Sequence, residues 1–344
     1  MSPASTRFLI ASVLACAGLI APVTTLAQPA PSATPAATPA APAAPPSWQQ
    51  GRKPEQSDST LHPFAPQMTG RPASELPIDK LKVPAGFKVE VWADGIPEAR
   101  SLALGDKGTV FVSNRLAKNV YAVVDRGGKR EVKTILKGLN SPNGIAFNKG
   151  TLYVAERNRI TRYDGIEDKL DNPPEGKVVV DGLDPTTQPG HFWKFLAFGP
   201  DGKLYFNIGS PQNIIMPTYM QAVLLRVDPT SGVVETYAQG VRQSVGFDWH
   251  PRTKELWFTD NARDWISDDL PEDKLSVVKH QGEHFGFPYC HQGDTLDAEY
   301  GKEHIAKTIE RCAAADRKVY EKTLDEHSGR LEELIAQRRN RERR

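Results

Sequence analysis

The chain has 344 residues, of which 39% are hydrophobic and 25% charged, proportions that are ordinary for a soluble protein of one large or two smaller domains. The formal net charge of +1 argues against a partner that is held by overall charge, such as nucleic acid. Three cysteines are too few for a scaffold held by disulfides. Any function must therefore come from a local site.

The first 27 residues are predicted to be a signal peptide. Arg7 precedes an apolar run at 8–20, and small residues up to Ala27 offer a cleavage site after that position. A lipoprotein signal with Cys16 acylated is the alternative, while a retained anchor has barely enough apolar length to cross a bilayer. The mature chain is therefore predicted to be periplasmic or secreted, without a membrane span.

Residues 28–75 are predicted to be a disordered linker. Their first part, 28–48, is almost entirely Pro, Ala, Ser and Thr, a composition that cannot bury a core and forms extended tethers. The segment that begins at Leu76 then leads into a first predicted strand at 88–92.

Four stretches of the chain repeat one plan, in which two strands are joined by a tight turn. These stretches are residues 101–114, 143–156, 194–209 and 245–261. Their equivalent positions are Ala103, Ala146, Ala197 and Asp248, at intervals of 43, 51 and 51 residues. Third strands are predicted at 120–124, 159–163, 222–227 and 275–278. A strand repeat of this period indicates an all-β fold of β-propeller blades, with a β-sandwich of unrelated hairpins as the alternative.

The third repeat carries the clearest turn signal. Phe195 and Ala197 alternate with other residues along its first strand, and a Pro-Asp-Gly turn at 200–202 precedes a second strand at 203–208. Asp-Gly between alternating hydrophobic residues is typical of a hairpin, because glycine tolerates a positive φ. His191 precedes this hairpin directly.

In a propeller the loops at one end of the central channel converge. The segments that enter the predicted blades carry Asn140, Asn143, His191, Arg242 and Gln243. A histidine titrates near neutrality and suits a general base, and an arginine can bind an oxygen that gains charge. The alternative is that His191 and Arg242 only cap strand ends.

Several motifs of the chain resemble one known family. They are the stretches 190–205 (GHFWKFLAFGPDGKLY), 240–250 (GVRQSVGFDWH), 258–265 (FTDNARDW), 268–271 (DDLP) and 284–291 (HFGFPYCH). Together they resemble the quinoprotein glucose/sorbosone dehydrogenase family, and most closely its L-sorbosone dehydrogenase-like branch. The resemblance covers residues 76–301, which it identifies as one propeller domain.

The resemblance implies a six-bladed propeller that binds pyrroloquinoline quinone (PQQ) and Ca²⁺ and oxidises a sugar or aldehyde, with an external electron acceptor. It implies that His191 takes the hydroxyl proton while hydride passes to the quinone, and that Arg242 steadies the developing oxyanion. The implied cofactor-binding residues are Gln243, Asn143, Asn261, Ala262 and Arg263. The implied calcium ligands are the backbone carbonyls of Ala262 and Arg263, with the carboxylates of Asp260 and Asp264.

The chain departs from the family pattern in two places. Where the family has Asp-Glu-Leu-Asn, this chain has Asp273-Lys274-Leu275-Ser276, which puts a cation beside the implied calcium site. After Gly301 the family continues into two further blades, whereas residues 302–344 show apolar residues at helical spacing and are predicted to form a basic α-helical tail. About four blades are thus recognisable.

Two alternative functions remain open. One is a truncated, catalytically impaired propeller that acts only as a binding module. The other is a calcium-dependent lactonase-type hydrolase, which would need carboxylate and amide ligands from several blades. Four blades would also leave apolar sheet faces exposed, which predicts self-association through these faces or through the helical tail.

Overall fold

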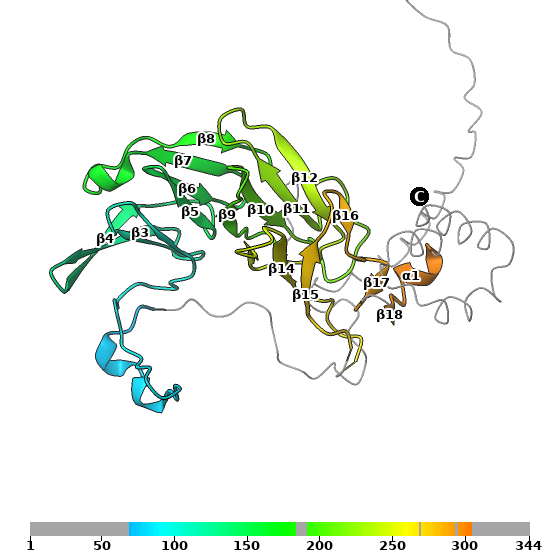
Figure 1. Ribbon diagram of the computed structural model, residues 1–344, viewed down its shortest axis with the longest axis horizontal. Coiled ribbons are helices and arrows are strands. Elements are labelled where there is room, and N and C mark those ends of the chain that lie inside the picture. Colours follow the sequence, from blue (N-terminus) through cyan, green and yellow to red (C-terminus); the bar gives the residue numbers. More distant parts are fainter. Residues whose placement is uncertain (1–68, 184–190, 268–269, 293–294, 305–344) are drawn as a thin grey trace, which may run out of the picture. The chain divides into compact units, whose positions relative to one another are not determined.

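The computed structural model describes residues 69–183, 191–267, 270–292 and 295–304. All of them belong to one compact unit of the chain, 45–344. The described part is all-β, with four antiparallel sheets, one small hairpin and a few short helical turns (Figure 1). The predicted β-propeller with four recognisable blades is confirmed.

The first two blades are four-stranded sheets whose strands follow one another in chain order. Blade 1 consists of β1 (Leu102–Leu104), β2 (Val110–Ser113), β3 (Val120–Arg126) and β4 (Lys129–Leu136). Blade 2 consists of β5 (Ile145–Asn148), β6 (Thr151–Ala155), β7 (Ile160–Asp164) and β8 (Lys177–Val180), with the 3-10 turn η5 (Ile166–Asp168) between the last two strands. The first strands of successive blades are neighbours, since β1 contacts β5 and β5 contacts β9 (Leu196–Phe198).

The last two blades differ from this plan. Blade 3 consists of β9, β10 (Leu204–Ile208), β11 (Val223–Val227) and β12 (Val234–Gln239), and β16 (Glu283–His284) adds a fifth strand parallel to β12. Blade 4 has three described strands, β13 (Phe247–Trp249), β14 (Leu256–Asp260) and β15 (Lys274–Val278). A hairpin of β17 (Cys290–His291) and β18 (Thr295–Leu296) follows, and then the short helix α1 (Tyr300–Glu303).

The predicted register of the repeats is confirmed. Each of the four equivalent positions is the second residue of the first strand of its blade, and each pairs with an interior residue of the second strand. The Pro-Asp-Gly turn is also present, with Gly202 at φ 75° and its N–H bonded to the carbonyl of Gly199 at 2.9 Å. The fourth strands β4, β8 and β12 were not predicted, because their exposed residues obscure the alternation.

The core lies between consecutive blades, which pack face to face. Strand β6 (TLYVA) is buried along its whole length, because its alternate side chains enter different cores. Leu152 and Val154 pack with blade 1 residues such as Phe111, whereas Tyr153 and Ala155 pack with blade 3 residues such as Phe206. A third cluster joins blade 3 to blade 4. This packing explains why the middle strands are continuous apolar runs.

The outer faces of the first and last blades remain apolar and exposed. On blade 1, Leu102 and Leu104 are 65% and 68% exposed, and on blade 4 Leu275 is 67% exposed. Such faces resemble the buried faces between the other blades, so self-association stays a prediction for them. No helix among the described residues is long and apolar enough to cross a membrane.

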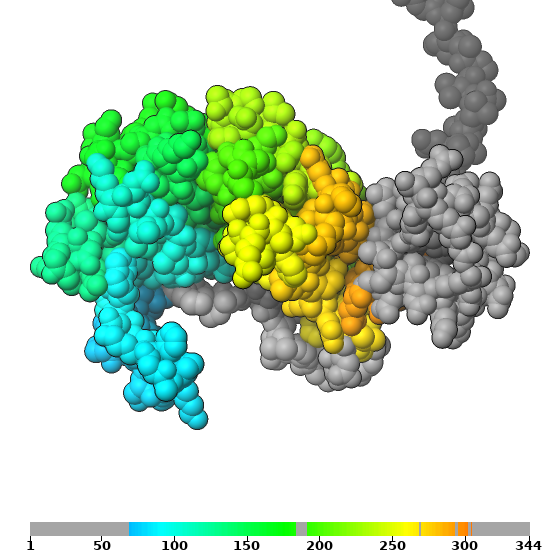
Figure 2. Space-filling view, viewed as in Figure 1, coloured from blue at the N-terminus to red at the C-terminus, as the bar shows by residue number. Residues whose placement is uncertain are grey.

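Two sequence predictions at the ends of the domain need correction. Residues 88–92 do not form a strand, because no described strand pairs with them, and Val89 and Trp92 are exposed. The last residues of the predicted linker, from 69, include the 3-10 turn η3 (Ala73–Glu75), and Ala73 N–H donates to Asp94 Oδ2 at 2.6 Å. After it comes a second turn, η4 (Ile78–Lys80), in a surface segment drawn in blue to cyan in Figure 2. The predicted signal peptide and helical tail lie outside the described residues.

Candidate active site at the blade entries

The topology of the blades brings two sets of loops to one end. The first and second strands of each blade are antiparallel, so the segment that enters the first strand lies beside the segment that leaves the second strand. Most of the predicted site residues belong to the entry segments. The connections between second and third strands reach the same end and supply further polar residues.

His191 and Arg242 are joined through the backbone of Ser210, the second residue after β10. The ring Nδ1–H of His191 donates to the carbonyl of Ser210 at 2.9 Å, and the N–H of Ser210 donates to the carbonyl of Arg242 at 2.7 Å. Ser210 itself is fully buried. The structure therefore brings the two predicted catalytic residues to one place.

Geometry and burial together indicate the protonation of His191. A carbonyl oxygen only accepts, so Nδ1 carries a hydrogen, and in the neutral ring Nε2 then has the lone pair. Burial of the ring and then the nearby charge of Arg242 lower its pKa to about 3, against the opposite effect of the Ser210 carbonyl. His191 is thus a neutral imidazole at ordinary pH, and its Nε2 accepts no hydrogen bond from a described residue.

Arg242 is buried and held by three residues. Its Nε donates to the carbonyl of Asn213 at 2.8 Å, and its Nη2 donates to Asn213 Oδ1 at 2.9 Å and to Asp264 Oδ2 at 3.3 Å. Its Nη1 donates to the carbonyl of Asn261 at 3.2 Å. These contacts use four of its five N–H groups. Most of the hydrogen bonds of Arg242 are therefore structural, as the strand-capping alternative predicted. One Nη1–H is left for another acceptor.

Two predicted cofactor-binding residues carry buried amide atoms without partners among the described residues. Both side-chain polar atoms of Gln243 lack a hydrogen bond, although the residue is 1% exposed, and so does Oδ1 of Asn143. A Cβ placed on Gly209 would lie 1.9 Å from Gln243 Oε1 and 2.6 Å from His191 Cβ, so only glycine lets these side chains meet there. Buried amide groups are normally satisfied, which points to a bound polar group or water.

The oxygen atoms of the loop 260–264 differ in whether they already have partners. Both oxygens of Asp260 are engaged, one by the N–H of Gln243 at 3.0 Å and the other by the Lys274 ammonium at 3.2 Å. The side chain of Asp264 is 57% exposed, and the carbonyl oxygens of Ala262 and Arg263 accept no hydrogen bond from a described residue. The cation that departs from the family pattern therefore neutralises Asp260 rather than occupying the remaining carbonyls.

The Arg263 side chain is part of a buried ion network instead of the predicted site. Its Nη1 lies 2.6 Å from Asp297 Oδ2, and its Nη2 lies 2.8 Å from Glu299 Oε1. The same Asp297 oxygen contacts His291 Nε2 at 2.8 Å. Arg263 and Asp297 have side chains exposed by 3% and 0%. This network attaches the loop 260–264 to the β17–β18 hairpin.

Sequence reasoning missed Ser210 and Asn213, which position the two catalytic candidates. Asn213 accepts from Arg242 and from the N–H of Asp264 at 2.7 Å, and its Nδ2 donates to the Asp264 carbonyl at 3.0 Å. Their place in the chain could have indicated this role, because both residues closely follow the hairpin that His191 precedes. No group of three or more His, Cys, Asp or Glu side chains that could hold a metal occurs among the described residues.

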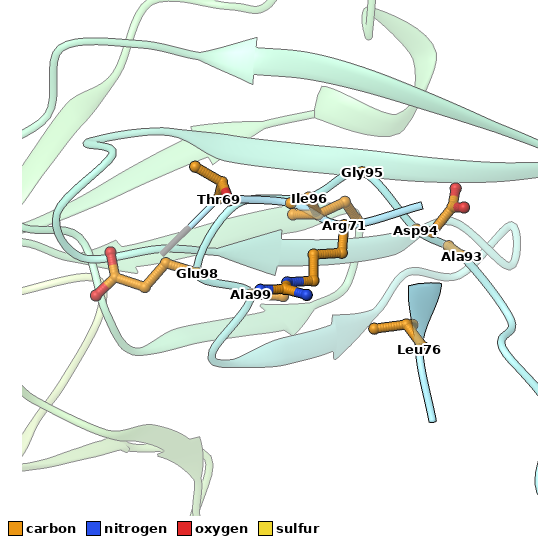
Figure 3. Close-up of a pocket in the computed structure, with 10 residues that line it drawn as sticks. Thr69, Arg71, Leu76, Ala93, Asp94, Gly95, Ile96, Glu98 and Ala99 are labelled. Atoms are coloured by element: carbon orange, nitrogen blue, oxygen red, sulfur yellow. The ribbon is translucent and has the colours of Figure 1, made fainter. Parts of the chain in front are cut away.

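A cavity of about 560 Å³ lies apart from these residues. It is formed between the segment 69–76 and the segment 93–99, and its lining includes Arg71, Asp94 and Glu98. Figure 3 shows the Arg71 side chain reaching across the cavity toward Ala99. None of the predicted site residues lines it.

Substitution of His191 by Gln is expected to flatten the pH dependence of stability between about pH 3 and 6.5. The folded-state pKa of His191 is lowered, so in this window the unfolded chain binds a proton that the folded chain does not. Wild-type stability should fall by up to about 1.4 kcal/mol per pH unit below pH 6.5 through this residue. Urea denaturation from pH 4 to 7 measures the slope, with His280→Gln, an exposed histidine, as the control. Equal slopes in wild type and His191→Gln would contradict the burial argument.

Comparisons with known proteins match the domain to one family model and to solved propellers. The family model described as TrAA12-like matches residues 81–314. An uncharacterized protein of Borreliella burgdorferi is 30% identical over 226 residues, which cover 63% of this chain and 59% of that protein. The holo form of the pyranose dehydrogenase PQQ domain from Coprinopsis cinerea is 17% identical, with a TM-score of 0.52, over 63% of this chain and 59% of its own.

A further similar structure is the iodide form of a Trichoderma reesei carbohydrate-active enzyme of family AA12. It is 20% identical, with a TM-score of 0.49, over 56% of each chain. This chain therefore spans less than two thirds of the length of these relatives. The identity to the Coprinopsis domain is low, so that structure shows the propeller fold alone.

Proposed function

The chain belongs to the TrAA12-like family, and from this membership and the site we propose that it is an exported, PQQ-dependent sugar or aldehyde dehydrogenase. The observation that carries the proposal is the neutral His191, which lies near the charge of Arg242 and approaches Gln243 at Gly209. The Coprinopsis domain, which is named for PQQ, supports the choice of cofactor. Sorbosone is one of the aldehydes that the proposed substrate class includes.

His191 would act as the general base. Its Nδ1–H donates to the Ser210 carbonyl, so Nε2 is the atom that would accept the hydroxyl proton of the substrate. The lowered pKa keeps the ring ready to accept at neutral pH, although it also makes it a weaker base before substrate binds. The remaining Nη1–H of Arg242 would donate to the oxygen that loses this proton, since its other N–H groups are engaged.

The residues present fit a polar cofactor at the entry end of blades 2 to 4. Gln243 and Asn143 carry the buried unpaired amide atoms, and Asn261 adjoins Gln243 through an N–H donated to its carbonyl at 2.8 Å. We assign these three residues to holding PQQ, together with the backbone of Ala262 and Arg263. When bound, the quinone would supply the acceptor for the hydride.

Calcium would be held mainly by backbone oxygen atoms. The carbonyls of Ala262 and Arg263 are free of described hydrogen bonds, and the exposed carboxylate of Asp264, the next residue, can add a ligand. Asp260 contributes less to this proposal, because Lys274 and the Gln243 N–H already engage its oxygens. The lactonase-type alternative needs a richer set of side-chain ligands and gains no support from the described residues.

One assay tests the proposal. The purified mature chain is incubated with Ca²⁺ and PQQ and then given D-glucose, other aldoses or sorbosone, with an artificial electron-accepting dye in place of the natural acceptor. Dye reduction that requires PQQ, Ca²⁺ and sugar is the expected result. If PQQ does not bind at micromolar concentrations, the dehydrogenase proposal for this chain is wrong, and the binding-module alternative becomes the better one.

A further inference from the structure

An arginine cluster lies next to His191, on the blade 1 side of the entry end. Arg115 follows β2, Arg100 precedes β1, and Trp193 precedes β9. The guanidinium carbon of Arg115 lies 4.7 Å from the centroid of the Trp193 ring, and that of Arg100 lies 5.6 Å from it. The Trp193 ring centroid is in turn 6.2 Å from that of His191. Two loops of blade 1 thus place two cations against an aromatic residue two positions from the predicted base.

This cluster has more positive charge than negative charge. Glu98 is the acid beside it, 3.5 Å from Arg115 Nε, and its other oxygen accepts the N–H of Leu116. Arg100 has no ion pair or side-chain hydrogen bond among the described residues, and it is only partly shielded from solvent. Burial and then the charge of Arg115 both lower the pKa of Arg100, so the two guanidinium groups affect each other. One carboxylate serves two neighbouring cations.

The cluster also has more hydrogen-bond donors than acceptors. The buried Nε of Arg115 makes no hydrogen bond with a described residue, although a Glu98 oxygen lies 3.5 Å away. The buried indole N–H of Trp193 has no described acceptor either. Buried donors of this kind are normally paired, and guanidinium groups bind carboxylates through two parallel hydrogen bonds. A ligand that brings acceptor oxygens and negative charge would satisfy both deficits.

We propose that Arg100 and Arg115, held against Trp193, form a subsite for a carboxylate of the ligand that occupies the His191 site. The proposal rests on the proposed function, and the carboxylate has two possible sources. It can belong to PQQ, which carries carboxylates, or to an acidic sugar such as a uronate. In both cases the subsite holds the ligand through residues of blade 1, whereas Arg242 and the loop 260–264 belong to segments next to the strands of blade 4.

The test measures binding to the full chain by isothermal titration calorimetry in the presence of Ca²⁺. The probes are PQQ, D-glucuronate and its neutral analogue D-glucuronamide, and the variants are Arg100→Gln and Arg115→Gln. Arg130→Gln is the matched control, since the Arg130 guanidinium lies 5.2 Å over the Trp92 ring, another arginine–tryptophan pair. Circular dichroism confirms that each variant is folded.

If the carboxylate belongs to PQQ, each variant should weaken PQQ binding by about ten- to a hundredfold, the loss of one charge-assisted contact. If it belongs to the sugar, the wild type should prefer glucuronate to glucuronamide by a similar factor, and the variants should lose this preference while PQQ affinity stays. The wild-type comparison needs no variant, so it holds even if Arg115→Gln fails to fold.

Two outcomes separate the subsite from the proposed function. If PQQ binds the wild type and both variants as it binds Arg130→Gln, and glucuronate is not preferred, the subsite is wrong and the dehydrogenase proposal stands. If PQQ does not bind the wild type at all, the dehydrogenase proposal is wrong, and the preference for glucuronate over glucuronamide still decides the subsite.

Discussion

Replacing His191 by Gln is expected to lower kcat for sugar oxidation by about two to four orders of magnitude, the usual worth of a positioned general base. Glutamine can still donate an N–H to the Ser210 carbonyl, so the local backbone should keep its arrangement. It has no lone pair of comparable basicity, so the substrate hydroxyl would lose its proton acceptor. Steady-state dye reduction with saturating PQQ and Ca²⁺ measures the effect.

The same variant should bind PQQ within a few-fold of the wild type, because the residues assigned to the cofactor are Gln243, Asn143 and the 261–263 backbone. Fluorescence titration of PQQ checks this point separately from turnover. His250→Gln, in the exposed turn between β13 and β14, is the control and should retain full activity. Turnover by His191→Gln close to the wild-type rate would show that another group accepts the proton.

Replacing Asp297 by Ala is expected to lower the free energy of unfolding by about 3–5 kcal/mol, as for other buried ion pairs that lose one partner. Asp297 is fully buried and meets Arg263 at 2.6 Å and His291 at 2.8 Å. It also accepts the N–H groups of Glu299 and Tyr300, each at 2.9 Å, at the start of α1. Alanine would leave the Arg263 guanidinium buried beside the half-exposed Glu299 alone.

Urea denaturation followed by tryptophan fluorescence measures this loss. Glu299→Gln is the matched control, because it removes the exposed partner of the same guanidinium and should cost less than about 1 kcal/mol. Although burial opposes it, hydrogen bonds from His291, the Tyr300 N–H and Arg263 hold the pKa of Asp297 at about 2. The contribution of Asp297 is therefore present above its unfolded pKa, and it is lost as the pH falls toward 2. A loss below 1 kcal/mol for Asp297→Ala would mean that Arg263 finds another partner.

The network also tests how the site loop is supported. Arg263 belongs to the loop 260–264, and Asp297 lies 34 residues further along the chain. If the network positions the carbonyls of Ala262 and Arg263, the Asp297 variant should also weaken Ca²⁺-dependent binding of PQQ. An unchanged affinity would show that the loop is held mainly by Asn213 and Arg242.

The blade register could be predicted from sequence because it depends on local alternation. Along Leu152–Val154, alternate side chains pack against different neighbouring blades, and Tyr153 shares a cluster with Phe206. A register shift of one residue would exchange these two faces of the strand. The position of His191 before the third hairpin followed for the same reason. The strand expected at 88–92 was wrong because a strand also needs a partner, and residues 88–92 meet none among the described strands.

The propeller blades, the place of His191 at a blade entry and the family resemblance could be predicted from sequence, since all of them depend on residues close in the chain. The contacts of each site residue depend on the folded chain. Ser210 joins His191 to Arg242, Asn213 reaches across 29 residues to hold that arginine, and Lys274 neutralises Asp260 from the next strand. These partners meet because loops from different blades converge at one end, and no local pattern records which polar groups pair when they do.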